Sequence, residues 1–219
     1  MLPGSSSAPT QTLSDGDDCD GAFTGTFHGI IYVSRRQNCT FANGAIYGNV
    51  IVNGGTLALS GDAIHGDVTV LRNSAFRISS YTEIDGNLDA GNLSAGGTAN
   101  YLCDSFVDGN LLLDGNQADM YIGSQSTALC GGDGIGGDLV AGNNRGVVAI
   151  TGGTVDGNAL LIHNLSNTEV FQNTVGGLLQ CAANVAIAAA GNTAWLKLGQ
   201  CAGVSGDDDH GVEKERREH

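Results

Sequence analysis

The side chains with the most distinctive chemistry in this 219-residue chain are six cysteines, at positions 19, 39, 103, 130, 181 and 201. Regularly spaced cysteines either bind a metal or form disulfides. Metal sites usually contain Cys-x-x-Cys pairs or cysteines clustered with histidines, and the sequence has neither pattern. Cys19 and Cys39 lie 20 residues apart, as do Cys181 and Cys201. We therefore expect disulfides and neither a metal site nor a cofactor, although six cysteines by themselves allow many pairings.

Carboxylates and basic residues are the other candidates for chemistry. A polysaccharide lyase or hydrolase needs clustered carboxylates together with a base or a bound cation. Asp85 and Asp108 each precede a recurring glycine, and a Ca²⁺ ion between them is conceivable. Exposed turn acids without a cation are the simpler interpretation. Since neither a Gly-x-Ser-x-Gly motif nor a phosphate-binding loop occurs, we expect a protein that is not an enzyme.

A glycine-containing repeat must position these residues. Glycine, a small polar residue and an aliphatic residue recur at steps close to 20 residues. This period, with strand-like alternation, is typical of a β-solenoid in which each repeat forms one coil. Hexapeptide-repeat acyltransferases also build short coils, but their strict six-residue aliphatic register is missing here. The repeats begin at Gly29, Gly48, Gly66, Gly86, Gly109, Gly137, Gly157 and Gly177.

The repeat from Gly48 to Gly66 indicates how one coil is built. Side chains alternate along a strand, so the aliphatic residues at alternate positions would face the interior. Gly54-Gly55 and Gly61-Asp62 would turn the chain between strands. The sequence thus predicts an all-β, single-stranded parallel β-helix of about eight or nine coils, with three short strands per coil, and we expect it to be right-handed. The inward residues of this repeat would be Val50, Val52, Leu57, Leu59 and Ile64.

The solenoid is expected to cover residues 19–203. Residues 1–18 are rich in Ser, Thr, Gly, Asp and Pro and predict a flexible leader, and residues 204–219 form a charged tail. The ends of a solenoid are open sheet edges that need covering. Residues 19–27 and the segment near Trp195 are the candidate caps.

Asparagine and aspartate occupy the position after the recurring glycine. These side chains tolerate turn conformations and bond local backbone, and stacked amides form ladders. Each Asp lies between two Asn, so like charges would never stack directly. We interpret this file as structural; its members are Asn49, Asp67, Asn87, Asn110, Asp138 and Asn158.

The repeat register narrows the cysteine pairing. Cys103 and Cys130 lie at nearly the same distance before Gly109 and Gly137, so all three pairs fall at similar positions on neighbouring coils. Neighbouring coils place Cα atoms about 5 Å apart, which a disulfide accepts. We predict the pairs Cys19–Cys39, Cys103–Cys130 and Cys181–Cys201. Three disulfides imply an extracellular, cell-surface or virion location.

An outward apolar file is the best candidate for a partner surface. Leu112, Val140 and Leu160, with Ile162 beside them, would expose aliphatic side chains on adjacent coils, and such patches usually mark interfaces. A covering loop or tail of the same chain is the alternative. Two longer repeats, with extra residues at 91–106 and 115–134, would form loops that carry binding residues. The full candidate set is Ile51, Leu112, Val140, Leu160, Ile162, Tyr101 and Tyr121.

Composition excludes several classes of partner. The chain has 23 acidic and 9 basic residues and a net charge of −14, so nucleic acid is not an expected partner. No apolar run is long enough for a membrane helix. The first residues show no basic region followed by an apolar core, as a signal peptide requires. We expect either a mature form with an added Met or a virion protein released by lysis.

Several segments resemble a group of small Gly-rich solenoid proteins, secreted by actinobacteria or carried by their phages. The resemblance spans about 19–203 and implies a parallel β-solenoid with paired cysteines; the group has no established activity to carry over. The chain differs from the group in Leu178, where a polar residue is usual, in the inserted loops and in lacking a leader, which favours the virion interpretation. The similar segments are residues 19–26, the Gly-Asn-Val steps, Cys39-Thr40 and residues 173–181.

Together these patterns predict a non-enzymatic structural or adhesive rod outside the cell. It would be displayed on a cell envelope or phage virion as a decoration, spacer or attachment module. It would bind a protein partner, or a second copy, through the outward apolar face, and a surface glycan is a further possible partner. The alternative is a carbohydrate-binding or polysaccharide-cleaving β-helix that uses the loops at 91–106 and 115–134.

Overall fold

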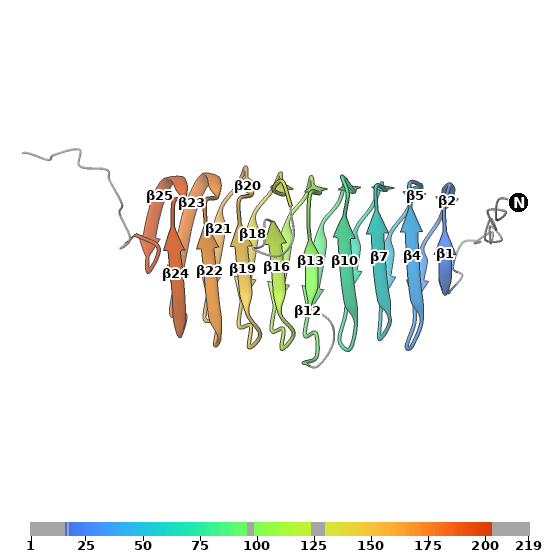
Figure 1. Cartoon of the computed structure of the whole chain (residues 1–219), viewed down its shortest axis with the longest axis horizontal. Coiled ribbons are helices and arrows are strands. Elements are labelled where there is room, and N and C mark those ends of the chain that lie inside the picture. Colours follow the sequence, from blue (N-terminus) through green and yellow to red (C-terminus); the bar gives the residue numbers. More distant parts are fainter. Residues whose placement is uncertain (1–15, 17, 96–98, 124–129, 203–219) are drawn as a thin grey trace, which may run out of the picture.

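The computed structural model describes residues 16, 18–95, 99–123 and 130–202. Within these ranges the chain is all-β, and its strands stack in parallel as a β-solenoid. Figure 1 shows the coils side by side along one axis, with the N-terminal and C-terminal coils at opposite ends. The predicted fold is therefore confirmed. None of the described residues belongs to a helix that would be long and apolar enough to cross a membrane.

The first strand of each coil belongs to one nine-stranded sheet, which we call the front sheet because it faces the viewer in Figure 1. Each strand pairs in parallel with the equivalent strand one coil away, so that Leu57 is in register with Cys39 and Phe76. The strands, in order, are β1 (Gly21–Phe23), β4 (Asn38–Ala42), β7 (Thr56–Ser60), β10 (Ala75–Ser79), β13 (Asn100–Leu102), β16 (Met120–Gly123), β19 (Val148–Thr151), β22 (Asn167–Phe171) and β24 (Ala186–Ala190).

The other two strands of each coil form a second and a third face, which β23 (Thr174–Ala182) joins into one sheet, with β25 (Thr193–Gly199) paired to β23. The second face contains β2 (Thr26–His28), β5 (Ala45–Tyr47), β8 (Ala63–Ile64), β11 (Glu83–Ile84), β14 (Phe106–Val107), β17 (Gly134–Ile135) and β20 (Thr154–Val155). The third face contains β3 (Ile31–Val33), β6 (Val50–Val52), β9 (Val68–Val70), β12 (Leu88–Gly91), β15 (Leu111–Asp114), β18 (Leu139–Gly142) and β21 (Ala159–Ile162).

Aliphatic and aromatic side chains from all three faces fill the interior. The predicted inward residues of the Gly48 repeat, for example Val50, Leu57 and Ile64, are at most 1% exposed. A single coil could not bury these side chains, so stacking of successive coils supplies the core and the hydrophobic stabilisation.

The recurring glycines allow adjacent coils to approach closely at the corner between the second and third faces. A Cβ atom on Gly66 would lie 2.5 Å from both the Gly48 carbonyl oxygen and the Asn49 Oδ1 atom. Any larger residue would therefore push the two coils apart. The close approach explains why glycine recurs once per coil.

The last coils depart from the predicted three short strands. Strand β23 continues through Gly176 and Gly177, where earlier coils turn between separate strands. Its pairing with β25 shifts register between Val175 and Leu178, because β25 has one residue fewer at this corner. Trp195 lies at the shift and is 82% exposed.

Most of the predicted leader and the tail at 204–219 lie outside the described residues, as do residues 96–98 and 124–129 of the predicted loops. Of the leader, Gly16 and Asp18 are described. The Gly16 amide donates to the Ile30 carbonyl at 3.1 Å, and Asp18 forms an isolated parallel bridge with Tyr32. These two residues contact the edge of the first coil.

Candidate functional site

The three predicted disulfides are present. The Cα–Cα distance is 5.3 Å for Cys19–Cys39, 5.2 Å for Cys103–Cys130 and 5.2 Å for Cys181–Cys201. Each bond joins neighbouring coils. The first and third bonds fasten the two end coils, and the second joins two coils near the middle of the stack.

The predicted file of Asn and Asp forms a continuous ladder on the surface. Asn49 Oδ1 accepts from the Asp67 amide at 2.9 Å, and Asp67 Oδ1 accepts from the Asn87 amide and side chain at 2.8 and 3.0 Å. The same pattern continues through Asn110 and Asp138. It ends where Asn158 Oδ1 accepts from the Leu178 amide at 2.9 Å. The structural interpretation of this file is confirmed.

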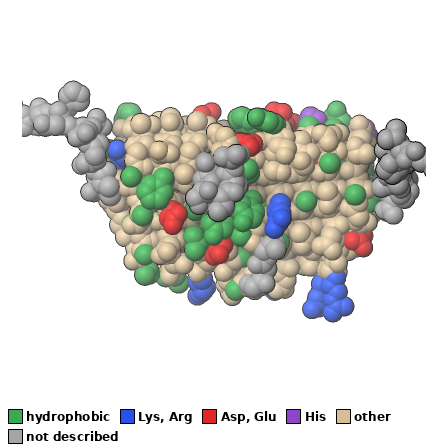
Figure 2. All heavy atoms as spheres, viewed as in Figure 1, with side chains coloured by type: hydrophobic (Ala, Val, Ile, Leu, Met, Phe, Trp, Pro, Cys, Tyr) green, Lys and Arg blue, Asp and Glu red, His purple; other side chains and the backbone are tan. Residues whose placement is uncertain are grey.

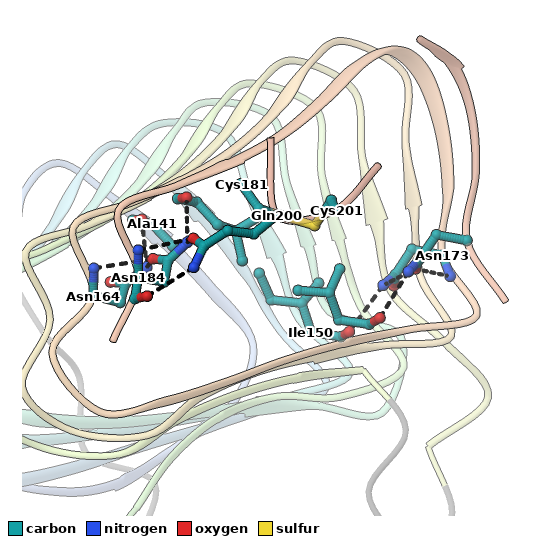
Figure 3. The surroundings of a disulfide bond; sticks show 11 residues. Ala141, Ile150, Asn164, Asn173, Cys181, Asn184, Gln200 and Cys201 are labelled. Carbon is teal, nitrogen blue, oxygen red and sulfur yellow. Dashed lines mark hydrogen bonds between the residues drawn. A yellow bond between two sulfur atoms is a disulfide. The ribbon is translucent and has the colours of Figure 1, made fainter. Parts of the chain in front are cut away.

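A second ladder, which sequence reasoning missed, runs inside the turn between the third face and the front sheet. Asn144 donates from its amide and side chain to Asn164 Oδ1 at 3.2 and 2.9 Å, and Asn164 donates in the same way to Asn184 Oδ1 at 3.0 and 2.9 Å. Gln200 Oε1 ends the ladder by accepting from Asn184. Figure 3 shows Asn164, Asn184 and Gln200 of this ladder near the Cys181–Cys201 disulfide.

The missed ladder has a sequence signal. Asn116, Asn144, Asn164 and Asn184 follow one another at steps of 28, 20 and 20 residues, which are the lengths of the coils they belong to. All four side chains are buried. Buried amides are normally hydrogen-bonded, and here every rung bonds its neighbours, so the ladder locks the turn of each later coil.

The corner between the second and third faces carries a file of ionisable and aromatic side chains. His28 stacks on Tyr47 with ring centroids 4.8 Å apart, and Tyr47 stacks on His65 at 4.3 Å. His65 Nδ1 then lies 2.6 Å from Asp85 Oδ2. These four residues each precede a recurring glycine, so the register of the coils places them in one file.

Three carboxylates follow in the same region. Glu83, Asp85 and Asp108 are exposed, and each has an oxygen within 4.8 Å of one from each of the others. Oxygen ligands of this kind suit Ca²⁺. Exposed acids at the turns of successive coils also gather in this way simply because the coils are in register.

The corner between the front sheet and the second face holds two buried acids. Asp62 Oδ1 accepts from the Gly44 amide and Oδ2 from the Ser60 amide, both at 2.8 Å, and burial raises the pKa of Asp62 above its ordinary value. Asp133 is 4% exposed, and burial raises its pKa to about 7, although the Ser105 and Gly123 amides oppose the rise.

Asp133 also differs from Asp62 in its partners. Its Oδ1 accepts from the Ser105 amide at 2.9 Å, while its Oδ2 has no hydrogen-bond partner of normal geometry among the described residues. The nearby Asp104 carboxylate raises the pKa further. Asp133 lies away from solvent, so its position suits a structural rather than a catalytic acid.

The candidate partner residues separate into two surfaces. Ile51, Leu112, Val140 and Leu160 share one outward file on the third face, but Thr69 and Asp89 separate Ile51 from the other three. Ile162 lies beside the file in β21 and, like its neighbours, is partly exposed. The aliphatic surface is therefore shorter than predicted at its N-terminal end.

The same face extends further than predicted at its C-terminal end. Leu178 and Leu196 are in register in β23 and β25, and Leu198 pairs with Gln180 in the continuation of the Leu112 file. Leu196 is 44% and Leu198 40% exposed. We use the name leucine surface for Leu112, Val140, Leu160, Ile162, Leu178, Leu196 and Leu198.

Tyr101 and Tyr121 do not belong to the leucine surface, which corrects their grouping with it. They lie on the outside of the front sheet, in register in β13 and β16, with ring centroids 5.4 Å apart and an interplanar angle of 19°. The Arg77 guanidinium lies 5.8 Å from the centroid of the Tyr101 ring. Figure 2 shows that backbone and uncharged, non-hydrophobic side chains cover most of this face, with a hydrophobic group near its middle and smaller ones elsewhere.

Comparison with protein-family models, with curated proteins and with solved structures finds no match to this chain.

Proposed function

We propose that this chain is a non-enzymatic structural and adhesive rod that works outside the cell, on an envelope or a virion. The observation that carries the proposal is the fastening of both ends of the stack: disulfides join the first and last coil pairs, while side-chain ladders tie the coils between them. Such a stack holds its two ends at a fixed separation, which is the property of a spacer or display module.

The disulfides also support the proposed location. Disulfides persist in oxidising environments and are rare in the cytosol. All six cysteines are paired, with no free thiol among them. The resemblance to secreted and phage-borne solenoid proteins points the same way and favours a particle or cell surface.

The ionisable groups support a role without catalysis. Asp133, whose pKa lies near neutral, is buried out of a substrate's reach. Glu83, Asp85 and Asp108 lie on an exposed corner. Catalytic acids and bases work best when their pKa is tuned at an accessible site.

Attachment would use the leucine surface. Apolar surface patches mark interfaces, and the partly exposed side chains of this surface lie on successive coils of one face, with Gln180 between Leu160 and Leu198. We propose that it docks the rod onto a protein partner or a second copy.

The location can be tested by quantitative mass spectrometry of virion, envelope and cytosolic fractions from a native source. The proposal expects enrichment in the particle or envelope fraction, and non-reducing peptide maps that contain all three disulfide-linked pairs. Enrichment in the cytosol with six free thiols would contradict it.

A second candidate function, binding or cleavage of a carbohydrate, is favoured by the Tyr101–Tyr121 pair with Arg77 beside it on the front sheet. Aromatic and arginine side chains on an open β-face suit sugar recognition. A glycan array combined with a reducing-sugar release assay tests this candidate, since binding without release would indicate a lectin-like role and release would indicate cleavage.

A further inference from the structure

A polar groove crosses the turns that lead into the front sheet at the N-terminal half of the rod. It encloses about 350 Å³, and residues from four successive coils line it. Its polar lining includes Arg36, Gln37, Asn38, Thr56, Asn73 and Ser94, with glycine and alanine between them.

Strand register and turn hydrogen bonds hold the groove in shape. Thr56 pairs with Asn38 on one side and Ala75 on the other, so the first residues of β4, β7 and β10 lie side by side. The Gly54 amide donates to Ser74 Oγ at 2.7 Å, and Ser94 Oγ donates to Asn73 Oδ1 at 2.6 Å. The walls are therefore set before any ligand arrives.

The charge of the groove is opposite to that of the chain. Among the described residues no carboxylate lines it, in a protein with 23 acidic and 9 basic residues. Arg35 lies in the same turn as Arg36, and Arg72 lies in the equivalent turn two coils later. Arg77 follows Ala75 by two residues on the same outward side of β10. The turns that lead into the front sheet lie along the lower edge of the molecule in Figure 2, and basic side chains project from this edge.

These arginines keep their charge available. Within the described ranges, the one ion pair is His65–Asp85, so none of these guanidinium groups has a carboxylate within 4.0 Å. Asp20 approaches one end of the groove, where its Oδ1 accepts from the Asn38 amide at 3.0 Å. Asp20 thus lies at the same end of the groove as Arg36, so an anionic group would be favoured between Arg36 and Arg77, on the side away from Asp20.

We propose that this groove binds an acidic polysaccharide, with a carboxylate or sulfate group on Arg36 and sugar hydroxyls on the amide and hydroxyl side chains that line the walls. Arginine forms paired hydrogen bonds with such anions, and Gln37, Asn38, Asn73 and Ser94 supply donors and acceptors for hydroxyls. The inference rests on the second candidate function, carbohydrate binding, and places the site on the turns rather than on the inserted loops.

Isothermal titration calorimetry with a hexamer of galacturonic acid and its neutral methyl ester tests the proposal at low and physiological salt. The acid should bind at least tenfold more tightly than the ester. Arg36→Gln should weaken binding of the acid about tenfold, because it removes a charge-assisted hydrogen-bonding group. Arg145→Gln, an equal charge change at a turn outside the groove, is the matched control and should change affinity less than twofold.

Thr56→Trp distinguishes binding in the groove from non-specific attraction of anions to the arginines, because it fills the centre of the groove without changing the charge of the protein. It should abolish binding while circular dichroism shows an intact fold. Equal losses in the Arg36 and Arg145 variants, unchanged binding by the Thr56 variant, or equal affinity for a single-stranded oligonucleotide would overturn the proposal. These binding results do not depend on the cellular fraction in which the protein is found. Failure of the groove proposal can therefore be distinguished from failure of the proposed structural role, which the fractionation experiment tests.

Discussion

Asp133 and Asn173 occupy the same position in coils two apart, and each accepts a hydrogen bond from the preceding coil, Asp133 from the Ser105 amide and Asn173 from the Gly153 amide. The two side chains differ in their other polar atom, which is Nδ2 in Asn173 and Oδ2 in Asp133. Asn173 Nδ2 donates to the Ile150 carbonyl at 2.8 Å, whereas Asp133 Oδ2 has no partner of normal geometry among the described residues. A protonated Asp133 can donate as the amide does, and an ionised one cannot.

This difference predicts a pH-dependent stability. The pKa of Asp133 is about 7 in the folded state and near its ordinary value of 3.8 in the unfolded chain. The stability contributed by the neutral acid is therefore complete below about pH 4 and is lost as the pH rises through 7. The loss corresponds to roughly 4 kcal/mol at most.

Asp133→Asn should remove most of this pH dependence and make the protein more stable than the wild type at pH 8. Guanidinium unfolding at pH 5, 6, 7 and 8 measures the effect. Asp156→Asn, at an exposed corner, is the control and should keep the wild-type slope. A variant at position 133 that is less stable than wild type at pH 8 would refute the assignment.

The buried ladder should contribute more than the surface ladder. Asn164→Ala removes the acceptor for Asn144 and leaves the Ala141 carbonyl without its side-chain donor, both inside the turn. We expect a loss of about 2–4 kcal/mol, because two buried polar groups lose partners. Asn158→Ala, the equivalent change in the half-buried surface ladder, should cost about 1 kcal/mol. Equal losses in chemical unfolding would show that burial of the ladder does not matter.

The Cys181–Cys201 disulfide should protect the last coil locally. Replacing both cysteines with alanine frees a 20-residue loop, which corresponds to about 3 kcal/mol of lost stabilisation. Since contacts in a solenoid join nearest neighbours, the effect should appear as faster amide exchange in β25 with little change in β7 or β10. The Cys103/Cys130 double alanine variant, as control, should leave β25 protected. Uniformly faster exchange in every strand would argue against local fastening.

The leucine surface should govern association. Leu112→Asp combined with Leu160→Asp places two charges on neighbouring parts of one outward file and should shift the mass measured by light scattering towards the monomer, or abolish capture of the partner. Ala58→Asp, which also introduces an aspartate but on the outside of the front sheet, is the control. The same mass for wild type and both variants, with partner capture also retained, would remove this surface from consideration.

The period of about 20 residues and the alternation within each repeat were sufficient to predict the solenoid, its inward residues, the surface ladder and all three disulfides. The reason is physical: parallel stacking in register converts equal spacing in sequence into neighbouring positions in space. Cys181 and Cys201, for example, needed no information beyond their separation. The buried Asn ladder had the same signal and was predictable in principle.

Other properties depend on which side of the coil a residue occupies and on what lies one coil away, and these were decided by the tertiary structure. Tyr121 and Leu112 belong to the same repeat, yet they point outward from different sheets. The raised pKa of Asp133 arises from its burial at the corner between the front sheet and the second face, which the repeat period does not specify. The groove at Arg36 exists because small residues of three further turns leave space beside it, and that space depends on side-chain size and packing across coils rather than on the period itself.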